Sequence, residues 1–162
     1  MWLPTISESS PDPDFRPKTP KKSVQKLRVY QTNRLSPLIL IVEEDEDTRL
    51  MMKYLLQIWK YRIIETASDV EAVALTESER PDLVLLSSRI QKNNSLTTIK
   101  RMREVAAHGE TEIIFVSAFS EPSLRASVLA AGADDFLVKP INFGHLEEML
   151  KQYLKRGERI ST

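Results

Sequence analysis

The sequence of 162 residues contains no cysteine and no long apolar run. The lack of cysteine excludes a disulfide framework, a thiolate metal site and a cysteine nucleophile, and it fits a reducing compartment. No segment approaches the ~20 consecutive apolar residues of a membrane span, and the N-terminal stretch MWLPTISESSPDP lacks the positive start and apolar core of a secretory signal. We therefore expect a cytoplasmic protein that does not cross a membrane.

The formal net charge is zero, but the charges are unevenly placed. The first 36 residues hold seven Lys or Arg against three acids, and five of the nine prolines. Such a composition cannot bury enough apolar surface to offset its chain entropy, so residues 1–36 are predicted to form a flexible, basic, Pro-rich N-terminal arm. Inside it, residues 25–30 (QKLRVY) alternate polar and apolar side chains and either add a short strand or belong to a solvated linker. Residues 37–156 are predicted to form one domain and residues 157–162 a C-terminal tail.

Five short apolar runs, rich in β-branched or aromatic residues, alternate with longer segments of helical periodicity. The runs are LILIV (38–42), RIIET (62–66), DLVLL (82–86), EIIFV (112–116) and DFLV (135–138). None alternates cleanly between polar and apolar residues, as expected for strands covered on both faces. Repeated strand–helix units of this length predict an α/β fold, a three-layer α/β/α sandwich around a five-stranded parallel sheet.

The intervening segments carry helix caps and apolar stripes. Asp47 or Thr48 is placed to cap a helix that ends near Tyr61, and Ser68 or Asp69 is placed to cap the next helix. The first helix is expected to pack inward through apolar residues at helical spacing: Leu50, Met51, Tyr54, Leu55 and Ile58. Further helix boundaries are predicted at Pro122, at Gly132 as a left-handed C-cap, and at Asn142 as an N-cap.

Polar residues follow four of these strands at their carboxyl ends, where open parallel sheets bind their ligands. Glu43 and Glu44 follow the first strand, Ser87 the third, Ser117 the fourth and Lys139 the fifth. Grouped carboxylates repel one another unless a cation or a lysine lies between them, and hard divalent cations prefer such oxygen ligands. We expect the fold to gather these side chains into one polar site.

Four segments, in this order and spacing, resemble the response regulator receiver domain family. LILIVEEDEDTR resembles the first strand and acidic loop of that family, PDLVLL the third strand, IIFVSA the fourth, and AGADDFLVKPI the fifth with its Lys–Pro step. The resemblance covers residues 37–156 and implies a CheY-like, flavodoxin-like sheet of strand order 2-1-3-4-5. It also implies a role in two-component or phosphorelay signalling, in which a receiver aspartate accepts a phosphoryl group from a histidine kinase beside a bound Mg²⁺.

The resemblance assigns a role to each of several positions. It implies an acidic pair at Glu43 and Glu44, the phosphoacceptor position at Ser87, the hydroxyl that follows the phosphoryl group at Ser117, the counter-charge at Lys139 and the switch aromatic at Phe136. Phe136 either packs in and out as that switch or is a core residue. Arg89, close after Ser87, either supplies a positive charge in place of Mg²⁺ or points to solvent.

Ser87 departs from the family because an alcohol stands where the family has a carboxylate. An aspartate is ionised at neutral pH and can attack phosphorus directly, whereas a serine hydroxyl needs a base. His108 and His145 are expected on the surface, away from Ser87.

Gln91 and Ser95 also stand where receivers usually have a proline and a glycine, so the loop that follows Ser87 is expected to take another path. With one carboxylate lost, Mg²⁺ binding is expected to be weak or absent, and Glu43 and Glu44 are only weak candidate ligands.

The leading hypothesis is therefore a stand-alone pseudo-receiver, not an enzyme, that binds a protein partner without aspartyl phosphorylation or a cofactor. In the family the partner contacts the fourth helix, fifth strand and fifth helix, here around Arg125 and Phe136.

A first alternative is serine phosphorylation at Ser87 or Ser88 with residual Mg²⁺ binding, and a homodimer is a further open alternative. Nucleic-acid binding through the basic arm ranks lowest, because only Tyr30 offers a ring for stacking. The basic residues in question are Lys18, Lys21, Lys22, Lys26 and Arg28.

Overall fold

The sheet contains five parallel strands in the order β2-β1-β3-β4-β5, as predicted. The computed structural model describes residues 36–88 and 94–159, and the account that follows concerns these residues. The strands are β1 (Leu38–Val42), β2 (Arg62–Thr66), β3 (Leu83–Ser88), β4 (Glu112–Ser117) and β5 (Asp135–Val138). All neighbouring strands pair in parallel, so their carboxyl ends meet at one edge of the sheet.

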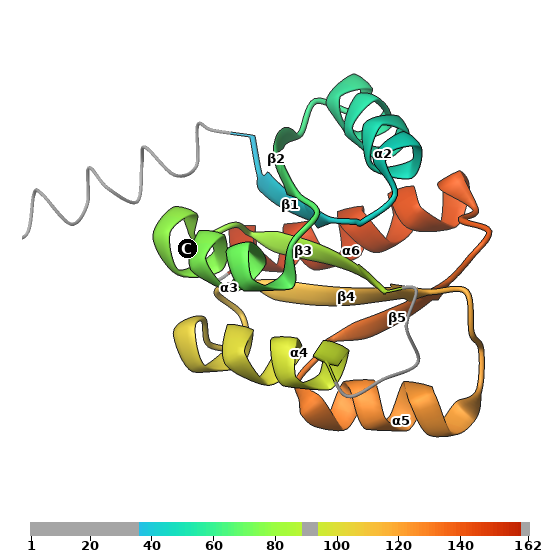
Figure 1. The fold of residues 1–162 in the computed structure, drawn as a ribbon. Coiled ribbons are helices and arrows are strands. Elements are labelled where there is room, and N and C mark those ends of the chain that lie inside the picture. The colour runs from blue at the N-terminus through green and yellow to red at the C-terminus, as the bar shows by residue number, and fades with distance from the viewer. Residues whose placement is uncertain (1–35, 89–93, 160–162) are drawn as a thin grey trace, which may run out of the picture.

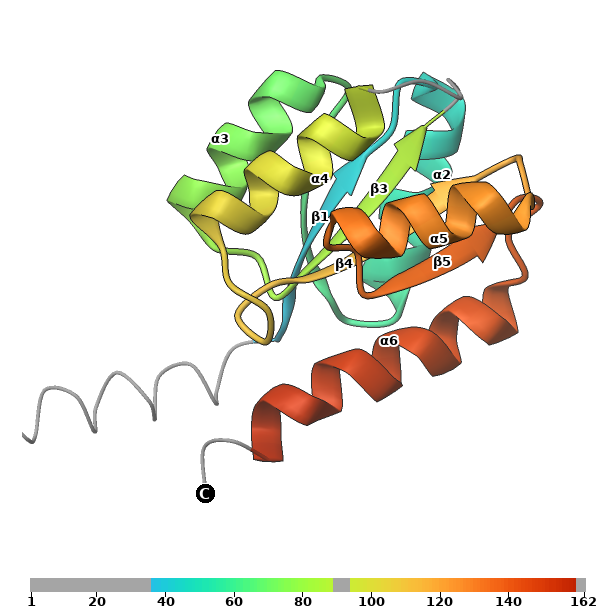
Figure 2. The same cartoon turned by 90° about the horizontal axis from the view of Figure 1, so that it is seen from below.

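Helices cover both faces of this sheet, which confirms the three-layer α/β/α architecture (Figures 1 and 2). The helices are α2 (Glu46–Ile58), α3 (Asp69–Glu79), α4 (Asn94–Val105), α5 (Pro122–Ala131) and α6 (Phe143–Arg159). Helices α2 and α6 lie on one face, and α3, α4 and α5 lie on the other. Within the described ranges, no helix combines the length and the apolar composition that a membrane crossing requires.

Each central strand contributes side chains to two separate apolar cores. Leu40 and Val42 of β1 belong to the core beneath α3, α4 and α5, whereas Ile39 and Ile41 belong to the core beneath α2 and α6. All four side chains are at most 2% exposed. Burial on both faces explains why these strands read as continuous apolar runs rather than as an alternating pattern.

Helix α2 differs from its sequence prediction at both its cap and its inward face. The N-cap is Asp45, whose Oδ1 accepts a hydrogen bond from the Thr48 backbone N–H at 2.8 Å. The residues buried beneath the helix are Met52 and Leu56. Four of the five residues predicted to face inward are exposed: Leu50 (43%), Met51 (44%), Tyr54 (58%) and Ile58 (70%). The prediction was wrong because α2 carries apolar residues on two sides, and only docking on the sheet selects one of them.

The other helix boundaries agree more closely with prediction. Ser68 caps α3 through a hydrogen bond from the Glu71 backbone N–H at 3.3 Å. Gly132 ends α5 with φ of 122°, and Asn142 Oδ1 accepts a hydrogen bond from the His145 backbone N–H at 3.0 Å at the start of α6. Helix α6 continues to Arg159, so it extends into the segment predicted as a tail. The predicted N-terminal arm, apart from Ser36, lies outside the described residues.

Candidate functional site

The carboxyl end of the sheet holds a buried ion pair between the first and fifth strands. Lys139 Nζ lies 2.9 Å from Glu43 Oε2, and the Glu43 side chain is only 1% exposed. The second oxygen, Oε1, accepts a hydrogen bond from the Asp45 backbone N–H at 3.0 Å. Arg49 of α2 donates from Nη1 to the Glu43 backbone carbonyl at 2.8 Å. Both carboxylate oxygens are therefore engaged, and the loop that carries them is tied to α2.

The surroundings of Glu43 favour its ionised form. Burial alone raises the pKa of Glu43, but the Ser87 hydroxyl, the Asp45 backbone N–H and the hydrogen bond and charge of Lys139 outweigh it, so the pKa lies below its ordinary value. Ser87 Oγ is itself buried, and among the described residues it makes no hydrogen bond of regular geometry. It lies close enough to the carboxylate to take part in this stabilisation. The predicted grouping of Glu43, Ser87 and Lys139 is thus present.

Ser117 lies one strand further along the same edge. It pairs in register with Ser88 of β3 and Val138 of β5 and is 2% exposed. Its Oγ accepts a hydrogen bond from the Phe119 backbone N–H at 3.0 Å, and its carbonyl accepts one from the Lys139 backbone N–H at 2.8 Å. Ser117 therefore fixes the turn after β4 and the start of the Lys139–Pro140 step, which is a cis peptide.

Glu44 is separated from the buried pair and lies instead near the start of α3. Its side chain is exposed, and its charge acts on Asp69. Burial and the charge of Glu44 raise the pKa of Asp69, and a hydrogen bond with Thr98 opposes them only partly. The sequence analysis named Asp69 only as a possible helix cap and missed it as a member of this edge, although it lies three residues after the end of the second strand. That position after a strand was the available signal.

Phe136 is a core residue in this structure. Its side chain is 5% exposed, and its ring centroid lies 5.6 Å from that of Phe115 with the two planes tilted by 44°. Both rings belong to the core beneath α3, α4 and α5. Of the two readings of Phe136, the structure shows the inward-packed arrangement.

Four other predicted positions lie away from the ion pair or outside the described residues. Arg89 and Gln91 are outside them. His108 is on the surface, with its Nδ1 3.2 Å from Asp134 Oδ1, and its side chain is 65% exposed. His145 is exposed in the first turn of α6. Within the described ranges neither imidazole makes a hydrogen bond with Ser87, and both side chains are exposed, which agrees with the prediction that both are surface residues.

The residues at this edge do not fit a Mg²⁺ ion well. Mg²⁺ requires near-octahedral oxygen ligands, usually with one or two free carboxylates. The Glu43 carboxylate is already paired with Lys139, and the third strand presents the neutral Ser87. Over residues 36–88 and 94–154, whose side chains the structure describes, no group of three or more Asp, Glu, His or Cys side chains is placed to hold a metal ion.

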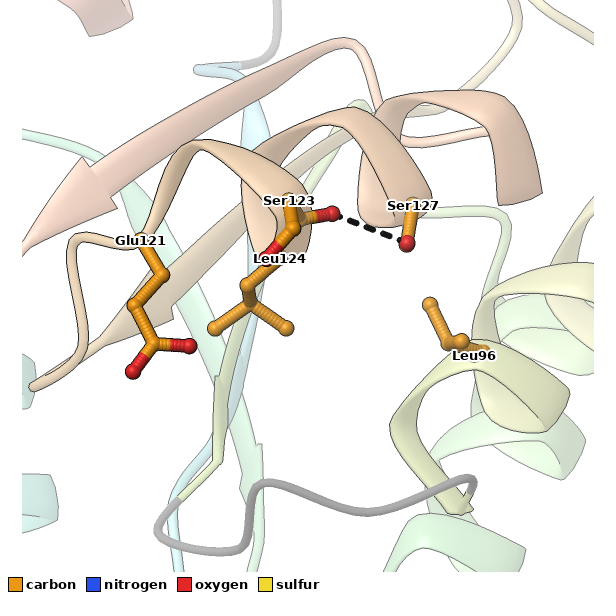
Figure 3. A pocket seen from close by; sticks show the side chains of 5 residues that line it. All are labelled: Leu96, Glu121, Ser123, Leu124 and Ser127. Atoms are coloured by element: carbon orange, nitrogen blue, oxygen red, sulfur yellow. Dashed lines mark hydrogen bonds between the residues drawn. The ribbon is translucent and has the colours of Figure 1, made fainter.

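A separate cavity of about 250 Å³ lies between α4 and α5 (Figure 3). Leu96 of α4 faces Leu124 of α5 across it, and Glu121, Ser123 and Ser127 complete its lining. The Ser127 hydroxyl donates to the Ser123 carbonyl at 2.9 Å, so part of its polar lining is satisfied internally. None of the residues predicted for the polar site lines this cavity.

Comparison with known protein families gives a match over most of the folded part. Residues 39–151 match the model of the response regulator receiver domain. The chain belongs to this family. Solved structures agree with this: the chain is similar to a two-component response regulator from Clostridium difficile, with 26% identity, a TM-score of 0.68, and coverage of 75% of this chain and 98% of that one. A response regulator from Thermotoga maritima matches with 28% identity and a TM-score of 0.66, over 75% of this chain and 99% of that chain.

Several curated relatives are named as transcriptional regulators and are longer than this chain. The probable transcriptional regulator ycf27 of Porphyridium aerugineum is 29% identical over 124 residues, which are 76% of this chain and 50% of that protein. The transcriptional regulatory protein ZraR of Salmonella typhimurium is 31% identical over 116 residues, 72% of this chain and 26% of that protein. This receiver therefore spans half or less of the length of these two relatives.

Proposed function

We propose that this receiver is a degenerate one, a cytoplasmic signalling module that binds a protein partner without aspartyl phosphorylation and without an enzymatic step of its own. The observation that carries the proposal is the neutral Ser87 at the end of β3, beside a Glu43 carboxylate that is already paired with Lys139. In a phosphorylatable receiver, the resemblance places an ionised carboxylate at the position of Ser87.

The chemistry at this position supports the proposal. A serine hydroxyl needs a base before it can attack phosphorus. The nearest carboxylate, Glu43, has a lowered pKa, so it is a weak base for this purpose. Ser87 is also only 5% exposed, which hinders approach of a phosphodonor. Lys139 already balances the charge of the buried Glu43 carboxylate, so this pair requires neither a metal ion nor a phosphoryl group as a counter-charge.

A docking surface for the partner is supported by exposed apolar residues on α5, β5 and α6. Leu129 of α5, Val138 of β5 and Phe143 at the start of α6 are 37%, 40% and 43% exposed. Arg125 is exposed on α5 in the same part of the fold. Apolar side chains with a charged residue beside them are typical of protein interfaces. We therefore propose that the partner contacts this face, named here the α5-β5-α6 face.

The proposal is tested by phosphodonor labelling of the natural chain and of Ser87→Asp. Both are incubated with acetyl phosphate and Mg²⁺ and analysed by intact mass, with hydroxylamine treatment to identify an acyl phosphate. We expect no adduct on the natural chain. Ser88→Asp is the matched control, because it adds the same carboxylate one position further on, and it is expected to stay unmodified.

The outcomes separate the alternatives. A hydroxylamine-sensitive adduct on the natural chain contradicts the proposal. A hydroxylamine-resistant adduct on Ser87 or Ser88 favours the serine-phosphorylation alternative instead. An adduct confined to Ser87→Asp supports the proposal and locates the difference from phosphorylatable receivers in a single side chain.

A further inference from the structure

Helix α2 presents an exposed apolar face that the fold leaves uncovered. Leu50, Met51, Tyr54 and Ile58, here called the α2 stripe, are 43% to 70% exposed and are half of the eight exposed large hydrophobic residues of the described chain. Their spacing places them on the side of the helix opposite Met52 and Leu56, which pack on the sheet. Scattered exposed apolar residues are ordinary, but four on one helix face mark an interaction surface.

Contacts on the other sides of α2 fix the orientation in which the helix presents the α2 stripe. Met52 and Leu56 are at most 1% exposed in the core shared with α6. Lys53 and Arg49 on the flank of the helix both lie near Glu65 of β2, at 3.1 Å and 4.0 Å. The stripe cannot turn inward without breaking these contacts, so no other part of the described chain buries it.

We propose that the α2 stripe pairs with the same stripe of a second copy of this chain, with the two helices antiparallel. The stripe is nearly symmetric about Tyr54, with Leu50 four residues before it and Ile58 four residues after it. A two-fold axis through Tyr54 places Leu50 of each copy against Ile58 of the other. Such self-complementarity is what a two-fold interface requires.

The charges at the two ends of α2 select the antiparallel arrangement. The first turn carries Glu46 and Asp47, the last turn carries no basic residue, and Lys60 follows the helix end. Antiparallel pairing brings the acidic first turn of one copy beside Lys60 of the other and also opposes the two helix dipoles. Parallel pairing would instead place Glu46 and Asp47 beside their own counterparts, which repel.

The proposed dimer is independent of the proposed function. The α2 stripe lies on a helix that covers the sheet face opposite α5, so the α2 pair leaves α5 of the α5-β5-α6 face accessible (Figures 1 and 2). The small size of the stripe, four side chains on a 13-residue helix, points to a weak, concentration-dependent dimer.

Sedimentation equilibrium of the full chain tests the dimer between about 1 µM and about 1 mM, the range in which a weak interface dissociates. We expect the mass to rise from that of one chain to that of two. Ile58→Glu is expected to weaken dimerisation by roughly tenfold or more, because it places a charge in the pairing surface. Val70→Glu is the matched control, since Val70 is 76% exposed on α3 and lies outside the stripe, and we expect no change.

A charge exchange tests the antiparallel direction separately. Glu46→Lys and Lys60→Glu are each expected to weaken the dimer, and the double variant is expected to restore it. Circular dichroism confirms that each variant is folded before its mass is measured. A chain that remains monomeric up to about 1 mM, a dimer unaffected by Ile58→Glu, or a double variant no better than the single ones would each overturn the proposal.

Discussion

Lys139 donates a hydrogen bond of 2.9 Å to Glu43 across 96 positions of sequence. The two members of this pair are unequally buried, since the Glu43 side chain is 1% exposed and that of Lys139 is 22% exposed. The pair therefore joins the carboxyl ends of β1 and β5, the first and last strands along the sequence, and leaves only the Lys139 side chain partly exposed to water. Loss of each partner has a different consequence.

Removal of the lysine should be the more damaging change. Lys139→Met leaves the Glu43 carboxylate buried without its counter-charge, and we expect a loss of roughly 3 kcal/mol of unfolding free energy at neutral pH. Glu43→Gln should cost less, because the ammonium group that it leaves behind is partly hydrated. Urea unfolding of both variants provides the comparison. The double variant should be more stable than Lys139→Met alone; equal costs for the two single variants would contradict this account.

The pH dependence of stability should report the ionisation of Glu43. Its pKa is lowered in the folded chain from an ordinary value of 4.5, so its stabilising effect is fully present above that value and is lost as the pH falls through the lower folded pKa. The difference in unfolding free energy between the natural chain and Glu43→Gln should therefore be largest near neutral pH and shrink in acid. A difference that stays constant well below pH 4.5 would show that Glu43 is not the group responsible.

Truncation of neighbouring methionines in α2 should show which side of the helix faces the core. Met52 is 1% exposed and Met51 is 44% exposed. Met52→Ala should cost about 2–5 kcal/mol because it opens a cavity beneath the helix. Met51→Ala should change the stability of the monomer by no more than about 0.5 kcal/mol. Thermal or urea unfolding at low protein concentration checks both values, and the reverse order would mean that α2 packs as the sequence pattern suggested.

Replacement of Gly132 should disturb a partly buried arginine. Gly132 has φ of 122°, and an added Cβ would lie 2.6 Å from Cγ of Arg103, whose Nε donates to the Gly132 carbonyl at 2.7 Å. Gly132→Ala should therefore cost clearly more than about 1 kcal/mol. Gly109→Ala is the matched control, because Gly109 also has a positive φ, of 86°, but its Cβ would meet nothing within 4 Å. Equal unfolding free energies for the two variants would exclude a role for the Arg103 contact.

Local patterns were enough to predict the strands and most of the helix ends. The runs at 38–42, 62–66 and 135–138 coincide with β1, β2 and β5, because a strand buried on both faces needs a short block of β-branched and aromatic residues. Ser68, Gly132 and Asn142 lie at the predicted caps, because capping depends on one side chain or one backbone angle. Ordered strand-end motifs then predicted that Glu43, Ser87 and Lys139 share one edge.

Other features depended on contacts that no local pattern contains. The inward side of α2 was predicted wrongly, because the stripe around Tyr54 and the pair Met52 and Leu56 are both at helical spacing. The proximity of Glu44 to Asp69 was missed, because it depends on the placement of α3 beside β1.

The sequence by itself determined the elements, their order and the kinds of polar group that meet at the carboxyl edge, because these follow from short-range periodicity and from strand ends. Only the tertiary structure decided that Lys139 pairs with Glu43 and not with Glu44, that Phe136 packs against Phe115, and that the α2 stripe faces outward. The physical reason is that burial and pairing are properties of distances between distant segments, and those distances exist only once the sheet has formed.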